Sequence, residues 1–187
     1  MAAVFQKNTW IFGYGLNYIY LDQLSSKKLE QVVQGFRINQ SGKRIDALMK
    51  TKGTISTLCF VEIKTHDTML LGREYREVCW APSAKLAGAL FQVQGTVAAG
   101  MYDRHVLRME DREGNPTGED VFNYAPKSYL VVGNLAEFIT DAGVNNNKLR
   151  SFELFRRNLI APEVITFDEL YQRAQFIVRQ SAPPPQQ

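Results

Sequence analysis

The residues best suited to chemistry lie in two neighbouring apolar segments, RIDALM and LCFVEIK. Side chains alternate between the two faces of a strand, so Glu62 and Lys64 share one face of the second segment. Asp46 lies among apolar neighbours in the first segment. If the segments pair antiparallel about a turn centred on Thr54, Asp46 stands opposite Glu62, with Cβ atoms about 4.5–5.5 Å apart. The spacing therefore predicts a cluster of two carboxylates and one ammonium group.

Such a cluster is typical of metal-assisted phosphodiester hydrolysis. Two carboxylates at that distance repel each other, and a divalent cation removes the conflict. Mg²⁺ takes hard oxygen ligands from one or two carboxylates, waters and substrate phosphate. Lys64 can orient or help deprotonate the attacking water, or offset charge on a pentacoordinate phosphorus. The alternative is an edge strand on which Glu62 and Lys64 pair in solvent, worth about 0–1 kcal/mol.

A glutamine on the following segment is the next candidate. Gln92 lies in the apolar stretch LFQVQG, where a side-chain amide needs hydrogen-bond partners. We expect it to project toward the carboxylates, where it can hold the nucleophilic water or a phosphate oxygen. The alternative is a partly exposed helix residue, and we expect Gln94 to be one.

The elements that position these residues follow from hydrophobic period and turn residues. Period-two patterns predict strands over 29–36, 44–51 and 57–64, and the turn Lys50–Ser56 joins the last two as a hairpin. A loop is expected over 65–82. The small and apolar residues of 83–101 predict a helix with Ser83 as N-cap.

The C-terminal half alternates strands and helices. Residues 103–128 are expected to form a polar hairpin or an exposed loop. The further expected elements are a buried strand over 128–135, a helix over 148–159, a strand over 162–167 and a helix over 168–180 capped by Asp168. The predicted class is α/β or α+β with one mixed sheet, in a single domain over 1–180 followed by a disordered tail over 181–187.

Composition sets broad limits on the class of protein. The chain has 187 residues, which favours one domain. It has no apolar run of about 20 residues that could cross a bilayer and no secretory signal pattern at its start, so we expect a soluble, cytoplasmic protein. Cys59 and Cys79 have apolar neighbours and are expected to be buried thiols without a zinc site. The net charge of +3 permits a polyanionic partner without requiring one.

Basic residues between the strand and the helix are candidate phosphate contacts. Arg73, Arg76 and Lys85 lie where a DNA backbone would pass, although a plain surface role explains them equally well; only phosphate contact predicts salt-sensitive affinity. His66 can share the face of Lys64 near a bound phosphate, or can simply end the strand in solvent. The arginines over 150–157 are interpreted as a solvated helix face.

Several motifs together resemble a known family. They are the entry segment WIFGYGL, RIDALM, the hairpin strand FVEIK, Pro82-Ser83 before the helix with Gln92, and the closing ITFDELYQRA. Their order, over residues 8–178, resembles the nuclease domain of the Shedu antiphage defence family, of the PD-(D/E)XK or restriction-endonuclease-like superfamily. The resemblance implies a central mixed sheet flanked by helices, Mg²⁺-dependent cleavage or nicking of DNA, and a homo-oligomer in bacterial immunity.

The resemblance also assigns roles to individual residues. Asp46 and Glu62 match the acidic metal ligands, Lys64 the catalytic lysine and Gln92 the helix glutamine. The carbonyl of Ile63 would be a further ligand of Mg²⁺, for which Mn²⁺ is the expected substitute. Family members often carry a regulatory N-terminal region, so a regulatory domain or partner is expected. Two alternatives stay open, a nuclease-like module that binds nucleic acid without cutting it and an oligomeric scaffold.

Overall fold

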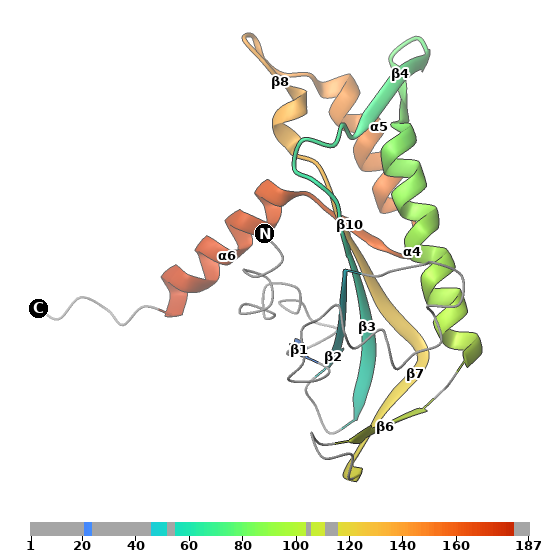
Figure 1. Ribbon diagram of the computed structural model, residues 1–187. Coiled ribbons are helices and arrows are strands. Elements are labelled where there is room, and N and C mark those ends of the chain that lie inside the picture. The colour runs from blue at the N-terminus through green and yellow to red at the C-terminus, as the bar shows by residue number, and fades with distance from the viewer. Residues whose placement is uncertain (1–20, 24–45, 52–54, 104–105, 111–115, 182–187) are drawn as a thin grey trace, which may run out of the picture.

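The computed structural model describes residues 21–23, 46–51, 55–103, 106–110 and 116–181 (Figure 1). The expected strand over 29–36, the N-terminal entry segment and residues 182–187 of the expected tail lie outside this part of the chain. Ser181, assigned to the tail, is the last residue of the final helix.

A mixed sheet forms the centre of the described fold, in the order β1-β2-β3-β7-β10, with β6 also paired to β7. Its strands are β1 (Leu21–Gln23), β2 (Ala47–Thr51), β3 (Ser56–Ile63), β6 (Val106–Glu110), β7 (Pro116–Val131) and β10 (Glu163–Ile165). β7 runs parallel to β3 and β10, whereas the other pairings are antiparallel. The predicted α/β class with a central mixed sheet flanked by helices is therefore confirmed.

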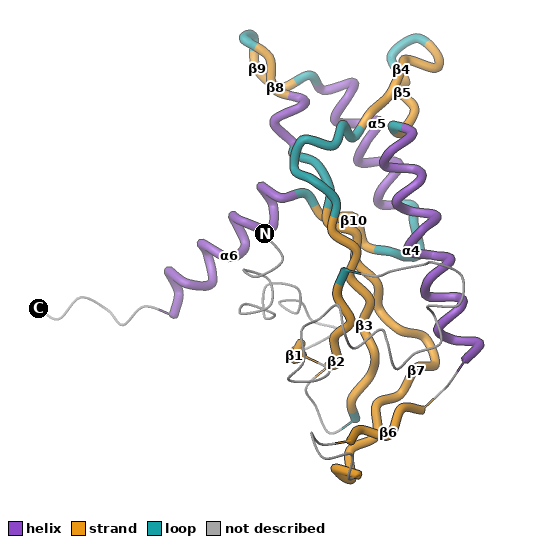
Figure 2. The backbone as a smooth tube through the Cα atoms, in the orientation of Figure 1, coloured by secondary structure: helices purple, strands orange, loops and turns teal. Residues whose placement is uncertain are grey.

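Helices flank the sheet on both sides, with α4 (Ala84–Asp103) along one side and α6 (Phe167–Ser181) leading away from the other (Figure 2). The third described helix is α5 (Asn146–Arg157). The odd-numbered residues of β3, such as Cys59 and Val61, are buried in a cluster with Leu170 of α6. Leu130 of β7 is buried on the opposite face in a cluster with residues of α4 and α5, including Phe152. The site residues must therefore be assigned to one face or the other.

The helix predicted over 83–101 forms as α4. The hydroxyl oxygen of Ser83 accepts a hydrogen bond from the backbone N–H of Leu86 over 3.0 Å, as an N-cap does. Leu86, Leu90 and Val93 are buried and Val97 packs beside them, which places the predicted stripe against the sheet. α4 continues two residues beyond the predicted end.

The expected loop over 65–82 is wrong in its second half. Residues there form a hairpin of β4 (Leu71–Arg76) and β5 (Cys79–Pro82). This hairpin projects beyond the N-terminal end of α4 (Figure 1). Most of β4 is exposed, so no hydrophobic alternation marks it as a strand. Cys79 is exposed on this hairpin, in contrast to the prediction, whereas Cys59 is buried as expected.

The polar segment over 103–128 forms the hairpin alternative rather than an exposed loop. β6 and the first half of β7 pair antiparallel across it. Of the predicted buried strand over 128–135, only residues 128–131 belong to a strand, as the end of the 16-residue β7, whereas residues 132–135 follow it and Leu135 begins a 3-10 helix. Exposed residues such as Asp120 and Tyr124 hid the length of this strand, because they interrupt its apolar pattern.

The predicted cap of α6 is wrong by two residues. The backbone N–H of Thr166 donates to Oε2 of Glu169 over 3.0 Å, and the carbonyl of Thr166 accepts from the N–H of Leu170, which makes Thr166 the N-cap. Asp168 lies inside the first turn, where its Oδ1 accepts from the backbone N–H of Leu135 over 3.1 Å. Its side chain therefore holds a neighbouring segment rather than its own helix.

The remaining short elements connect β7 to α5. They are the 3-10 helix η2 (Leu135–Phe138) and the small hairpin of β8 (Ile139–Thr140) and β9 (Gly143–Val144). Asn145 caps α5 by accepting from the N–H of Lys148 over 3.1 Å, so α5 begins at Asn146, two residues before the predicted start. Among the described helices, none combines the length and apolar character that crossing a membrane requires.

Candidate active site

The predicted hairpin register brings the two acids together. Ala47 pairs with Val61 and successive residues follow antiparallel, so one further step in this register puts Asp46 opposite Glu62. Asp46 directly precedes β2, and its Oδ2 accepts the backbone N–H of Ile63 over 2.8 Å. The first carboxylate is therefore anchored to the backbone at the end of β3.

Glu62, Lys64 and Gln92 form a closed set of hydrogen bonds. Oε1 of Glu62 accepts from Nζ of Lys64 over 2.6 Å and from Nε2 of Gln92 over 2.7 Å. Nζ of Lys64 also donates to Oε1 of Gln92 over 2.9 Å. The amide of Gln92 thus donates to the anion and accepts from the cation, which uses both of its polar groups.

This arrangement differs from an ion pair on an exposed strand edge. β3 lies between β2 and β7, and Glu62 is only 3% exposed. The side chain of Lys64 is 31% exposed, so the ammonium group lies between the buried carboxylate and solvent. A charged pair of this kind gains strength from its low-dielectric surroundings but also carries a desolvation cost.

The sheet and α4 together position the glutamine. Glu62 lies opposite Leu130 of β7, whose side chain faces α4. Gln92 is half-buried on α4, one residue before the buried Val93. The expectation that Gln92 projects toward the carboxylates agrees with its two bonds to Glu62 and Lys64.

Burial raises the pKa of Glu62, because the ionised carboxylate loses hydration. The hydrogen bond from Lys64 opposes this shift, while the negative charge of Asp46 adds to it. A cation placed between Asp46 and Glu62 would oppose this shift, because it favours the ionised carboxylate.

The donor set is compatible with a hard divalent cation. No group of three or more His, Cys, Asp or Glu side chains suited to a metal occurs in the described part of the chain. The carboxylates of Asp46 and Glu62 are the two side chains of the cluster that could hold a cation, and the backbone of Ile63 lies beside Asp46. Mg²⁺ commonly accepts this pattern, completing its shell with water and substrate oxygens.

The four residues expected to bind DNA are all exposed and lie between Lys64 and Gln92 in the sequence. Arg73 and Arg76 lie on β4, and Lys85 lies in the first turn of α4. His66 follows the end of β3, with its ring edge-on to Phe167 of α6 at 6.3 Å. The ring of His66 therefore packs near α6. The side chain of Gln92, in contrast, reaches β3 from α4.

One positioning residue has no signal in the sequence. The carboxylate of Glu137 in η2 accepts the backbone N–H groups of Leu70 and Leu71 over 2.6 and 3.1 Å. It thereby fixes the segment that leaves the cluster and enters β4. The partners are more than sixty residues apart in sequence, so no local pattern could indicate the contact.

These features define an α/β protein with an acid–lysine–glutamine cluster between an interior strand and a covering helix. The family model described as "Shedu protein SduA, C-terminal" matches residues 1–171. The chain therefore belongs to the Shedu family. Shedu protein SduA of Bacillus cereus (strain B4264) is 29% identical over 181 residues, which cover 95% of this chain and 44% of that relative. The chain thus spans less than half the length of this relative.

Proposed function

We propose that this chain is a metal-dependent DNA endonuclease or nickase that acts in bacterial antiphage defence. The observation that carries the proposal is the convergence of Asp46, Glu62, Lys64 and Gln92 on one face of the sheet. Membership of the Shedu family supports the defence role. The reaction is hydrolysis, in which water forms one P–O bond as another breaks, leaving a phosphate monoester and a hydroxyl.

Each residue of the cluster has a distinct task in this proposal. Asp46 and Glu62 hold the cation, with the carbonyl of Ile63 as the expected third protein ligand. When bound, Mg²⁺ supplies positive charge at the reacting phosphate and lowers the pKa of a water molecule. Lys64 offsets charge that develops on the phosphorus oxygens, and Gln92 keeps Lys64 and Glu62 in register and orients water or a phosphate oxygen.

The exposed basic residues that lie between Lys64 and Gln92 in the sequence are proposed to hold the DNA backbone. Arg73, Arg76 and Lys85 extend from β4 and the start of α4, and His66 follows β3. Arg76 lies over the ring of Tyr75 at 5.7 Å, and Tyr75 itself is 69% exposed. When cationic side chains contact phosphates, the affinity for DNA falls steeply as the salt concentration rises.

This chain matches only part of a longer relative, and that difference in length is the basis for proposing partners. Because the chain spans 44% of Shedu protein SduA from Bacillus cereus, we propose that a regulatory region or partner controls the nuclease. A homo-oligomer in the cytoplasm is proposed on the same family grounds.

Plasmid nicking tests the proposal directly. We expect cleavage with Mg²⁺ or Mn²⁺, none with EDTA, and none with Asp46→Asn, Glu62→Gln or Lys64→Met. Asp141→Asn is the matched control, because Asp141 is exposed in the turn between β8 and β9. Unchanged nicking by Glu62→Gln would remove that residue from the mechanism.

DNA affinity measured at several salt concentrations separates the alternatives. Salt-dependent binding without any metal-dependent cut would favour a nuclease-like binding module. No DNA affinity, together with large assemblies in light scattering, would favour a scaffold.

A further inference from the structure

The two carboxylate oxygens of Glu62 have different surroundings. Oε1 accepts one hydrogen bond from Nζ of Lys64 and another from Nε2 of Gln92. A carboxylate oxygen has about two lone-pair sites, so these donors occupy both sites of Oε1. Among the hydrogen bonds of the described residues, none ends on Oε2. One oxygen of Glu62 is thus committed to the protein, and the other is available to a ligand.

Burial keeps this division of roles in place. Glu62 is 3% exposed, on a strand that lies between β2 and β7. Nζ of Lys64 also donates to Oε1 of Gln92, so the three side chains form a closed set. Turning the carboxylate so that both of its oxygens faced one ion would break two bonds to an anionic acceptor, which are stronger than bonds between neutral groups. The carboxylate of Glu62 is therefore held in one orientation by its neighbours.

Asp46 is constrained less than Glu62. Its Oδ2 accepts the backbone N–H of Ile63 over 2.8 Å, which occupies one lone-pair site of that oxygen. Within the described residues this carboxylate keeps a site on each oxygen and can offer either one or both to a cation. The supply of carboxylate oxygens at the cluster is therefore limited by Glu62.

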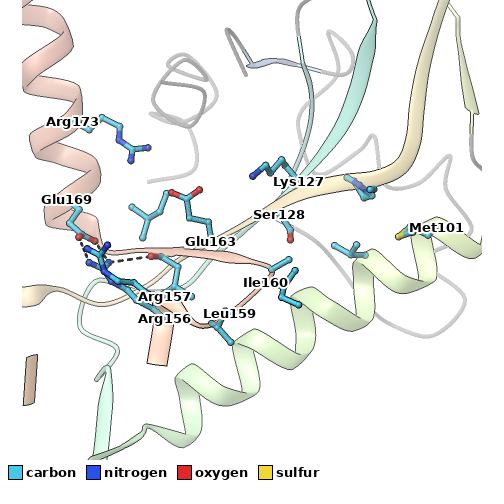
Figure 3. Close-up of a pocket in the computed structure, with 16 residues that line it drawn as sticks. Met101, Lys127, Ser128, Arg156, Arg157, Leu159, Ile160, Glu163, Glu169 and Arg173 are labelled. Carbon is cyan, nitrogen blue, oxygen red and sulfur yellow. Dashed lines mark hydrogen bonds and ion pairs between the residues drawn. The ribbon is translucent and has the colours of Figure 1, made fainter. Parts of the chain in front are cut away.

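A cavity of about 760 Å³ opens beside β7, and none of the four cluster residues lines it (Figure 3). Its lining includes the segment 125–128 of β7 and Arg156, which is bonded to Glu169. This cavity therefore adds no ligand to the cluster. The choice of cation depends on the donors and acceptors of the cluster itself.

The number of available carboxylate oxygens distinguishes the common divalent cations. Mg²⁺ is held by one or two carboxylates and keeps several of its waters, whereas Ca²⁺ takes about six to eight oxygens and often both oxygens of one carboxylate. Mn²⁺ accepts the same kinds of oxygen ligand as Mg²⁺. A glutamate that presents a single oxygen therefore suits Mg²⁺ and Mn²⁺ better than Ca²⁺.

We propose that Gln92 and Lys64 make the cluster selective for Mg²⁺ and Mn²⁺ over Ca²⁺, because they hold Oε1 of Glu62 and leave a cation only Oε2. The inference rests on the proposed nuclease function and extends it, since it makes Gln92 a positioning residue that determines which cation the cluster accepts. Each donor occupies one lone-pair site, so removal of either one opens Oε1 to a second bond with the ion.

Electron paramagnetic resonance of free Mn²⁺, with the full chain and without DNA, tests the proposal independently of cleavage. We expect the wild type to bind Mn²⁺, and Mg²⁺ to displace it at a concentration about tenfold lower than Ca²⁺ requires. Equal displacement by the two ions would overturn the selectivity and leave the proposed nuclease function standing. Mn²⁺ binding that persists undiminished in Glu62→Gln would overturn both, because the cation would then lie elsewhere.

Variants of α4 provide a matched pair for the same measurement. Gln92→Leu should raise the affinity for Ca²⁺ relative to Mg²⁺ by about threefold to tenfold, whereas Gln94→Leu should leave the ratio unchanged, because this amide bonds the carbonyl of Ala161. Lys64→Met should shift the ratio in the same direction as Gln92→Leu. Both ions carry the same charge, so a general loss of structure or of positive charge changes both affinities together and not their ratio. A ratio unchanged in either variant of the cluster would remove that residue from cation selection.

A crystal of the wild type soaked in Mn²⁺ gives a measurement that needs no variant. We expect Glu62 to contact the ion through one oxygen, while Lys64 and Gln92 remain bonded to the other. Contact of both Glu62 oxygens with the ion would overturn the proposal.

Discussion

Nε2 of Gln92 donates to Oε1 of Glu62 over 2.7 Å and so joins α4 to β3 across thirty residues of sequence. The same amide accepts from Lys64 over 2.9 Å. Because one side chain contacts both the anion and the cation, the geometry of the cluster depends on where the helix lies on the sheet. Gln92 thereby braces a pair whose members also bond each other directly over 2.6 Å.

Replacement of Gln92 by leucine is expected to lower the nicking rate about tenfold or more, because Lys64 and Glu62 lose their common partner. Gln94→Leu is the matched control, since this exposed amide on the same helix bonds the carbonyl of Ala161 instead. The measurement is initial rate on supercoiled plasmid with Mg²⁺. Equal rates for the two variants would contradict a role for Gln92 in positioning.

Mg²⁺ is expected to raise Tm of the wild-type chain, by about 2–4 °C for each kcal/mol of binding free energy. The rise should disappear in Glu62→Gln and Asp46→Asn, which lack a charged ligand. It should persist in Lys64→Met, which removes only the neighbouring ammonium group. Differential scanning fluorimetry measures it, and a rise retained in the two acid variants would place the cation elsewhere.

Gly133→Ala is expected to destabilise the fold by about 2–4 kcal/mol. Gly133 has φ of +64°, and an added Cβ would lie 2.6 Å from both Cδ2 of Leu70 and the carbonyl of Thr68. Gly143→Ala shares a positive φ, but its Cβ would meet nothing within 4 Å, so its cost should be smaller. Urea unfolding of both variants measures the difference, and equal costs would show that crowding by Leu70 is unimportant.

The contact between Glu169 and Arg156 is expected to make stability sensitive to acid. Burial tends to raise the pKa of Glu169, but hydrogen bonds and charge from Arg156, with the amide of Thr166, outweigh it and lower that pKa. A lowered pKa stabilises the fold above the ordinary glutamate pKa, and this contribution is lost as pH falls through the folded value. Glu169→Gln should therefore cost about 1–3 kcal/mol at neutral pH and progressively less in acid.

Chemical unfolding of the wild type and Glu169→Gln across this pH range measures the difference in free energy. Glu77→Gln serves as the control, because Glu77 is exposed and the same change there should have little effect at any pH. A difference that stays constant from neutral pH into acid would show that the carboxylate of Glu169 is not the titrating group.

Local patterns were sufficient to predict the elements nearest the cluster. The hairpin register follows from alternation in two apolar segments and the turn between them, and it places Asp46 opposite Glu62 as predicted. Ser83 is a recognisable cap, and the stripe of Leu86, Leu90 and Val93 faces the core. These features depend on neighbours in sequence, so a single chain can reveal them.

Other elements could not be predicted because exposed polar residues mask their strands. The hairpin of β4 and β5 buries little and so lacks an apolar period. β7 is polar over most of its length and apolar only at its end, over 129–131, so its two parts were assigned to different elements. The cap at Thr166 was missed because Asp168 is also a common cap residue.

The sequence alone determined which residues can carry charge at the cluster and the strand face on which Glu62 and Lys64 lie, because side-chain alternation is a property of the extended backbone. Tertiary structure alone decided that Gln92 closes the network, that Glu137 fixes the exit from the cluster, and that a cavity opens beside β7. These contacts depend on how helices and strands distant in sequence pack, and the packing is settled by burial of the two core clusters on opposite faces of the sheet.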